Sequence, residues 1–171
     1  MKHRNVEIKA RCRDAKAVRA ALLARGARPH GTDRQTDTYF HVPRGRLKLR
    51  QGNIETALIH YDRPDRPGPK QARIRLYRPP DPPALKAVLS AALGVRAVVA
   101  KTREIFFLDN VKFHIDSVRG LGRFVEIEAI GAAGTIGPDR LRRQCRRYMR
   151  LLGIGPADLV AGSYADMTTA G

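Results

Sequence analysis

Cysteine, aromatic side chains and long hydrophobic runs are all scarce in this sequence. The two cysteines, Cys12 and Cys145, lie far apart and have neither metal-knuckle nor redox spacing, so no disulfide framework is predicted. No segment is long and apolar enough to span a bilayer, and the first residues lack the apolar stretch of a signal peptide. These absences lead us to expect a soluble, cytoplasmic protein with no membrane partner.

Acidic residues are also scarce relative to basic ones. The 33 lysines and arginines against 16 aspartates and glutamates give a net charge of +17 over 171 residues. A charge of this size favours an anionic partner, either nucleic acid or a small polyanion. The chain has no Trp and no recognisable nucleic-acid-binding motif, which makes nucleic acid the less favoured of the two.

A predicted helix over residues 137–153 is the main argument for nucleic acid. Its basic face could bind nucleic acid or a membrane surface. Alternatively, it is an ordinary helix face that points into solvent and has no partner. We favour the solvated face. Its arginines are Arg140, Arg142, Arg143, Arg146, Arg147 and Arg150.

The turn residues and the hydrophobic periodicity predict one domain, residues 1–171, built mainly from short strands. Helices are predicted after the N-cap Asp14, over residues 84–93, and over the arginine-rich segment. Tight turns join most of the strands, so neighbouring strands should be antiparallel. The predicted strands lie near residues 5–13, 34–41, 46–51, 55–62, 70–78, 95–108, 111–118 and 124–130.

Charged residues occupy every second position of several predicted strands. Glu7 and Lys9 would share one face of the first strand, because a β-strand sends alternate side chains to opposite faces. An open sheet would leave these faces in water, whereas a closed barrel would bring them together in a polar lumen. The predicted fold is α+β: an eight-stranded antiparallel β-barrel with a polar lumen, flanked by about three helices that cover its apolar outer face.

Sorting the alternating charges by sign separates a basic group from an acidic one. The bases form a candidate triphosphate cradle, since arginine grips phosphate with two hydrogen bonds and lysine acts as a point charge. The acids offer the hard oxygen ligands that Mg²⁺ or Mn²⁺ requires among phosphates. The bases are Lys9, Arg46, Lys48, Arg50, Arg73, Arg75, Lys101 and Arg103, with His60 as a further phosphate donor; the acids are Glu7, Asp116, Glu126 and Glu128.

Several motifs resemble the CYTH superfamily, the triphosphate tunnel metalloenzymes, over nearly the whole chain. Residues 5–9 are similar to its N-terminal Glu-x-Glu-x-Lys signature, although the first acid is Asn5 here. Residues 46–50 resemble its basic strand, and Lys101-x-Arg103 resembles its later basic pair. The segments that resemble the class IV adenylyl cyclase branch in particular are residues 111–128 and Ser163-Tyr164-Ala165-Asp166.

The resemblance implies an eight-stranded tunnel that binds a triphosphate through bases and one or two divalent cations through acids. By position, the implied metal ligands are Glu7, Asp116, Glu126 and Glu128. The implied phosphate ligands are Lys9, Lys48, Arg50, Lys101 and Arg103, with His60 the nearest candidate for a further base on the strand 55–62. The predicted catalytic residues are Glu7, Lys9, Lys101, Asp116 and Glu126.

Three functions stay open at this point. The leading one is a class IV type adenylyl cyclase, in which the ribose 3′-hydroxyl of ATP attacks the α-phosphate to give 3′,5′-cyclic AMP and pyrophosphate. The second is hydrolysis of tripolyphosphate, thiamine triphosphate or a nucleotide in the same tunnel. The third is a non-catalytic binder of nucleic acid or polyphosphate. A homodimer is left open.

Overall fold

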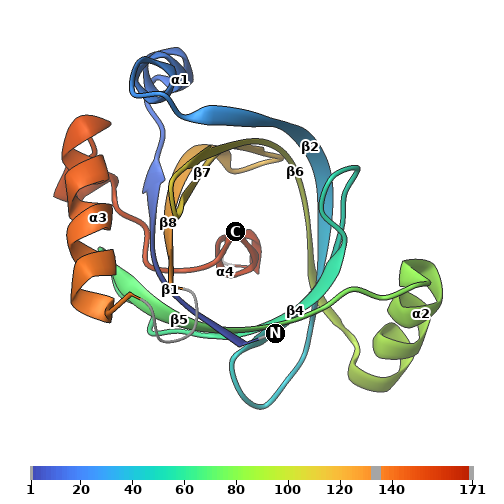
Figure 1. The fold of residues 1–171 in the computed structure, drawn as a ribbon. Helices are drawn as coiled ribbons and strands as arrows, with labels where there is room; N and C mark the ends of the chain where they lie inside the picture. The colour runs from blue at the N-terminus through green and yellow to red at the C-terminus, as the bar shows by residue number, and fades with distance from the viewer. Residues whose placement is uncertain (1, 132–135, 170–171) are drawn as a thin grey trace.

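Eight antiparallel strands close into a barrel in the computed structural model, which describes residues 2–131 and 136–169 (Figure 1). The strands follow the order β1-β5-β4-β3-β2-β6-β7-β8, and β8 pairs with β1 to complete the ring. The predicted eight-stranded barrel is therefore confirmed. The strands are β1 (Lys2–Arg11), β2 (Arg28–Phe40), β3 (Arg46–Gln51), β4 (Ala57–Asp62), β5 (Lys70–Tyr77), β6 (Val95–Leu108), β7 (Val111–Val118) and β8 (Gly122–Gly131).

Four α-helices and one short 3-10 helix accompany the barrel in the described residues. Asp14 and Asp81 are N-caps and accept hydrogen bonds from the backbone N–H groups of Ala17 (2.9 Å) and Ala84 (3.0 Å). No helix within the described ranges is long and apolar enough to cross a membrane. The helices are α1 (Ala15–Ala24), α2 (Pro82–Leu93), α3 (Pro138–Leu151), η1 (Pro156–Asp158) and α4 (Tyr164–Thr169).

The main hydrophobic core lies outside the barrel, where α1 and α3 cover β1, β7 and β8 (Figure 1). Phe113 of β7 and Tyr148 of α3 meet edge to face, with ring centroids 4.9 Å apart. Leu22 of α1 and Cys145 of α3 are fully buried in the same cluster. Because the helices bury the apolar face of these strands, the charged positions in between must point into the lumen.

Strand β5 has the opposite phase to the predicted one. Arg73 and Arg75 are exposed, while Ala72 is buried and Ile74 packs against the interior cluster. His60 of β4 pairs with Arg75 and therefore shares the outer face. The prediction that these three side chains line the lumen is wrong. The outer surface of β5 meets water, so arginine is stable there and the apolar residues turn inward.

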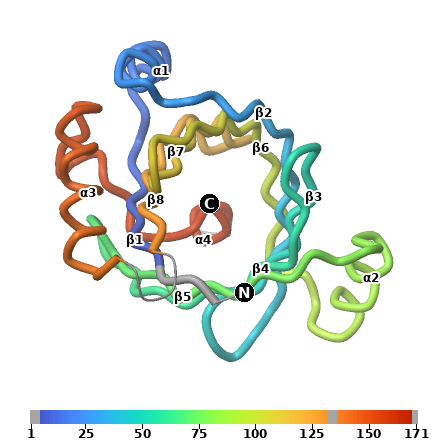
Figure 2. Tube along the Cα trace, viewed as in Figure 1, coloured from blue at the N-terminus to red at the C-terminus, as the bar shows by residue number. Residues whose placement is uncertain are grey.

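The short helix α4 lies within the ring of strands (Figures 1 and 2). Tyr164 and Ala165 are buried there together with Tyr39, Tyr61 and Phe124 of the barrel wall. The rings of Phe124 and Tyr164 meet edge to face, with centroids 5.0 Å apart. One end of the barrel interior is therefore filled by aromatic and apolar groups, and the polar part of the lumen begins next to Tyr164.

We expect Phe113→Ala to destabilise the fold by about 3–5 kcal/mol, because this fully buried ring loses its contacts and leaves a cavity. Urea unfolding followed by circular dichroism measures the change. Val88→Ala on α2, where the residue is 64 % exposed, is the control and should change the free energy of unfolding by less than about 0.5 kcal/mol. Equal effects of the two substitutions would contradict a core packed outside β7.

Candidate active site

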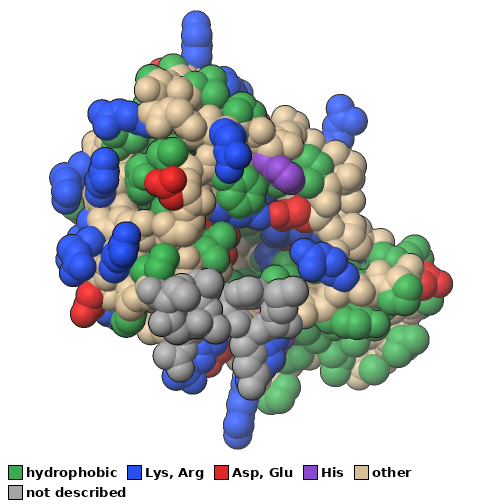
Figure 3. All heavy atoms as spheres, viewed as in Figure 1, with side chains coloured by type: hydrophobic (Ala, Val, Ile, Leu, Met, Phe, Trp, Pro, Cys, Tyr) green, Lys and Arg blue, Asp and Glu red, His purple; other side chains and the backbone are tan. Residues whose placement is uncertain are grey.

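The inward-facing positions of the strands bring most of the predicted bases and acids into one lumen. Glu7 and Lys9 of β1 lie in register with Glu128 and Glu126 of β8. Figure 3 shows a hollow in the middle of one face of the molecule, with basic and acidic side chains on its walls. The predicted residues that line the lumen are Glu7, Lys9, Arg46, Lys48, Arg50, Lys101, Arg103, Asp116, Glu126 and Glu128.

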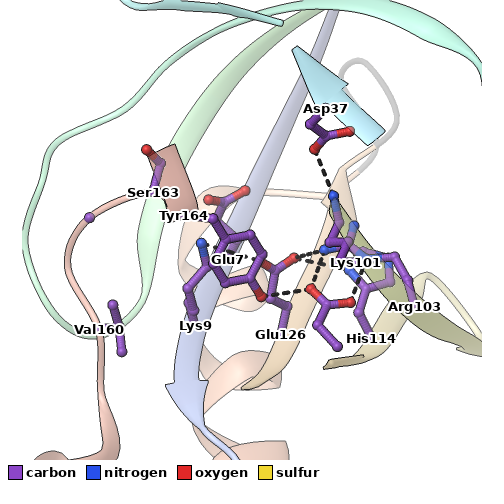
Figure 4. A network of polar contacts seen from close by, with 12 residues as sticks. Glu7, Lys9, Asp37, Lys101, Arg103, His114, Glu126, Val160, Ser163 and Tyr164 are labelled. Atoms are coloured by element: carbon purple, nitrogen blue, oxygen red, sulfur yellow. Dashed lines mark hydrogen bonds and ion pairs between the residues drawn. The ribbon is translucent and has the colours of Figure 1, made fainter. Parts of the chain in front are cut away.

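Arg103 of β6 links the acids of β7 and β8 (Figure 4). Its Nε and Nη2 atoms donate to both carboxylate oxygens of Asp116, at 2.7 and 2.5 Å, and Nη2 also donates to Glu126 Oε2 at 2.9 Å. Burial alone would raise the pKa of Asp116 and of Glu126, but Arg103 outweighs it and holds both below their ordinary values. Both acids are therefore carboxylates at neutral pH.

Tyr164 of α4 completes this group from the filled end of the lumen. Its hydroxyl donates to Asp116 Oδ2 at 2.6 Å, and Lys9 Nζ lies 3.6 Å from the centre of its ring. Lys9 Nζ is also 3.4 Å from Glu126 Oε1. Burial raises the pKa of Tyr164 well above its ordinary value, so the phenol keeps its proton and acts as a donor.

A second group of acids lies along β1 and β8. Arg63 pairs with Glu7 at 3.0 Å, and Asn5 Nδ2 donates to Glu128 Oε1 at 2.5 Å. Burial raises the pKa of Glu7, and the carboxylates of Glu128 and Glu126 raise it further. Like charges therefore face one another across β1 and β8, which is the condition that a bound cation relieves.

Asp37 of β2 gathers three of the predicted bases. Its carboxylate accepts hydrogen bonds from Arg50 Nε and Nη2 (both 2.9 Å), from Lys48 Nζ (2.9 Å) and from Lys101 Nζ (2.7 Å). The side chains of Asp37 and Lys101 are fully buried. Burial lowers the pKa of Lys48 to about 8 and that of Lys101 well below its ordinary value. These cations are thus held in place by an internal acid.

The lumen also holds charged residues that were not predicted from the sequence, among them Asp37, Glu55, Arg63 and Lys70. Lys70 is almost fully buried and donates to the backbone oxygen of Ala161 at 2.8 Å, and burial lowers its pKa to about 8. The signal of alternation was weak for all of them. Arg63 belongs to a proline-rich loop, and Asp37 has polar neighbours on the other face of β2, so neither shows a charged–apolar pattern.

The lumen acids have the chemistry of a Mg²⁺ or Mn²⁺ site. In the described ranges no three or more acids, histidines or cysteines converge closely enough to hold a metal ion among themselves, since bases and amides now hold the acids. However, Glu7, Glu126 and Glu128 offer hard oxygens from two paired strands. Asn5 Oδ1 is buried and has no hydrogen-bond partner among the described residues. By donor chemistry, these residues fit a hard divalent cation.

A pocket of about 440 Å³ adjoins the lumen near α4. Tyr39 and Arg46, which face the lumen, line it together with His41 and Arg96. Asp166 of α4 holds both arginines, at 2.8 Å from Arg46 and 2.6 Å from Arg96. The pocket has the size of those that bind small molecules, with aromatic and charged side chains in its wall.

The CYTH domain model matches residues 3–164, nearly the whole chain. The chain belongs to the CYTH domain family. The resemblance that its motifs suggested is therefore confirmed. No curated protein matches the chain.

Solved structures of low sequence identity share this CYTH fold. The PH1012 protein of Pyrococcus horikoshii OT3 is 24% identical and superposes with a TM-score of 0.83, covering 95% of this chain and 98% of that one. A putative adenylate cyclase from Vibrio parahaemolyticus is 17% identical, with a TM-score of 0.79 and coverages of 96% and 97%. A putative adenylyl cyclase from Hippeastrum, described as having a dominant triphosphatase activity, is 15% identical, with a TM-score of 0.61 and coverages of 96% and 94%.

We expect the lumen to bind tripolyphosphate, used as an anionic probe without metal, about tenfold more weakly once the pH rises through the pKa of Lys48. That pKa is lowered to about 8 by burial, so Lys48 is a cation below this pH and neutral above it. Isothermal titration calorimetry on both sides of this pH measures the change.

The Lys48→Gln variant should show a flatter pH profile, because it removes one of the two lumen lysines whose pKa is lowered to about 8 and leaves only Lys70. Lys16→Gln, a change at an exposed position on α1, is the control and should keep the profile of the unmodified protein. If Lys48→Gln keeps the full pH dependence, the role assigned to Lys48 is wrong.

Proposed function

We propose that this CYTH protein is a divalent-metal-dependent enzyme that acts on a triphosphate bound in the lumen. One observation carries the proposal: buried bases from β1, β3 and β6 face the same interior as the half-buried acids of β1 and β8 and the buried acid of β7. Arginine and lysine recognise phosphate, whereas carboxylates approach phosphate only when a cation lies between them. A binder that used positive charge alone would gain nothing from the acids.

The favoured reaction is the conversion of ATP to 3′,5′-cyclic AMP and pyrophosphate. The pocket beside Tyr39 and Arg46 supports a nucleotide over inorganic tripolyphosphate, because it offers space for an organic group next to the lumen bases. The structural similarity to the Vibrio parahaemolyticus protein, described as a putative adenylate cyclase, is consistent with this choice.

In the proposed reaction, the ribose 3′-oxygen forms a bond to the α-phosphorus while the bond to the bridging oxygen breaks and pyrophosphate leaves. Lys9, Lys101 and Arg103 would bind the phosphates and offset the negative charge that develops on the leaving group. Glu7, Asp116, Glu126 and Glu128 would hold Mg²⁺ or Mn²⁺, which when bound supplies Lewis-acid stabilisation of the phosphoryl oxygens. No side chain is assigned as a dedicated base.

Hydrolysis of a triphosphate is the second candidate. It uses the same bases and acids with water in place of the ribose hydroxyl. The similarity to the Hippeastrum protein, with its dominant triphosphatase activity, is the observation that favours it.

The reaction products distinguish the two reactions. The protein is incubated with ATP and, separately, with tripolyphosphate. Each incubation contains Mg²⁺ or Mn²⁺, and a chelator is added in the control. Cyclic AMP with pyrophosphate supports the cyclase, orthophosphate supports hydrolysis, and no product with either metal would falsify both.

We expect Glu126→Gln and Arg103→Gln each to lower turnover by about 100-fold or more, because each removes a charged group that faces the phosphates or the cation. Initial rates of product formation measure this loss. Arg75→Gln is the matched control, since Arg75 is an exposed arginine on the outer face of β5 and should keep full activity. Equal losses in Arg75→Gln and Arg103→Gln would contradict a reaction inside the lumen.

A further inference from the structure

The geometry points to Asp37 as a specificity-determining residue: its carboxylate takes the place of one phosphate group in the basic cradle and thereby limits how many phosphate groups the lumen binds. This inference rests on the proposed function, because it requires that the lumen binds polyphosphate. Asp37 is not one of the acids that we assign to the metal. It comes from β2, on the side of the barrel formed by β3 and β6.

The surroundings of Asp37 are those of a bound phosphate group. Arg50 presents Nε and Nη2 to its two oxygens, both at 2.9 Å, which is the paired geometry that arginine uses for carboxylate and phosphate alike. Lys48 and Lys101 each add a hydrogen bond to Oδ2, at 2.9 and 2.7 Å. Four charged hydrogen bonds thus converge on one buried anion that belongs to the protein itself.

The other hydrogen bonds of Arg50 and Lys101 show which donors Asp37 makes unavailable to a ligand. Arg50 also donates from Nη1 to Glu55 Oε2 at 3.1 Å, so all three of its nitrogens already have acidic partners. Lys101 is different, because among the described residues its ammonium group pairs only with Asp37 and keeps further protons for a ligand. A phosphate group can therefore bind Lys101, whereas the paired face of Arg50 stays occupied.

Asp37 is close enough to the proposed phosphate path to act on a ligand. Figure 4 shows Lys101 between Asp37 and the group formed by Arg103, Glu126 and Tyr164. A phosphate at Lys101 would meet the negative charge of Asp37 in a site with little water, where like charges repel strongly. Each phosphate beyond those bound near Arg103 would have to compete with Asp37 for the same cations.

The same carboxylate offsets the mutual repulsion of the cations in the cradle. Burial lowers the pKa of Lys48 and Lys101, so without an anion these side chains would lose protons or repel Arg50. Asp37 favours the charged form of both lysines and holds them in place before a ligand arrives. Asp37 therefore orders the basic side chains in advance, but it occupies the place where one further phosphate group would bind.

We expect the Asp37→Asn variant to prefer tetrapolyphosphate over tripolyphosphate more strongly than the unmodified protein does. The substitution removes one negative charge and frees the paired donors of Arg50. Titration calorimetry with pyrophosphate, tripolyphosphate and tetrapolyphosphate, all without metal, measures the affinities. The ratio of tetrapolyphosphate to tripolyphosphate affinity should rise about tenfold over that of the unmodified protein. Asp62→Asn changes the net charge equally at an exposed position and should leave the ratio unchanged. Asp37→Glu keeps the charge and should also keep the ratio.

A charge-balanced variant covers the case in which Asp37→Asn does not fold. Asp37→Asn with Lys48→Gln removes one acid and one base but still frees Arg50, so the preference should again shift to the longer ligand. An unchanged ratio in folded Asp37→Asn, alone or combined with Lys48→Gln, would overturn the inference and leave the proposed function intact. If the unmodified protein binds none of the three polyphosphates, the proposed function itself fails.

Discussion

Close pairing of opposite charges inside the barrel is the interaction on which the rest of this structure depends. Arg103 binds Asp116 and Glu126 at once, and Asp37 binds three cations. Each of these groups would be costly to bury alone, so they are stable only as a set. The set in turn requires that strands from both halves of the chain meet in one register. A shift of one residue in β8 would turn Glu126 and Glu128 into the outer core.

The hydrophobic core supports this arrangement from outside. Phe113, Ile127 and Val6 project away from the lumen and pack under α1 and α3, so the same strands that carry charge inward are anchored by apolar contacts outward. The basic side chains of α3 lie on its solvent-facing side, as Figure 3 shows, and the helix buries Leu141, Cys145 and Tyr148. The solvated face predicted for this helix agrees with that placement.

The sequence was most informative where one face of a strand is buried by a helix. On β1, β6, β7 and β8 the apolar residues pack under the helices, so the charged residues that alternate with them face the lumen. The alternation therefore predicted the correct orientation of Glu7, Lys9, Arg103, Asp116 and Glu126. On β5 the same alternation was ambiguous. An Arg-Ile-Arg pattern reads equally well in either phase, and only the exposed outer surface of this strand decides that the arginines lie outside.

Other features could not be predicted from local pattern at all. Asp37 is recognisable as a partner of Lys48, Arg50 and Lys101 only when β2, β3 and β6 are side by side. Arg63 reaches Glu7 from a loop, and Tyr164 reaches Asp116 from a short helix near the end of the described chain. These contacts depend on tertiary structure, for which periodicity carries no signal.

The closure of the barrel also has a consequence for folding. Strand β1 pairs with both β5 and β8, so its hydrogen-bonding edge toward β8 stays open until residues 122–131 have been synthesised. Because this pairing joins residues 4–11 to residues 124–131, we expect ring closure to be a late step in folding.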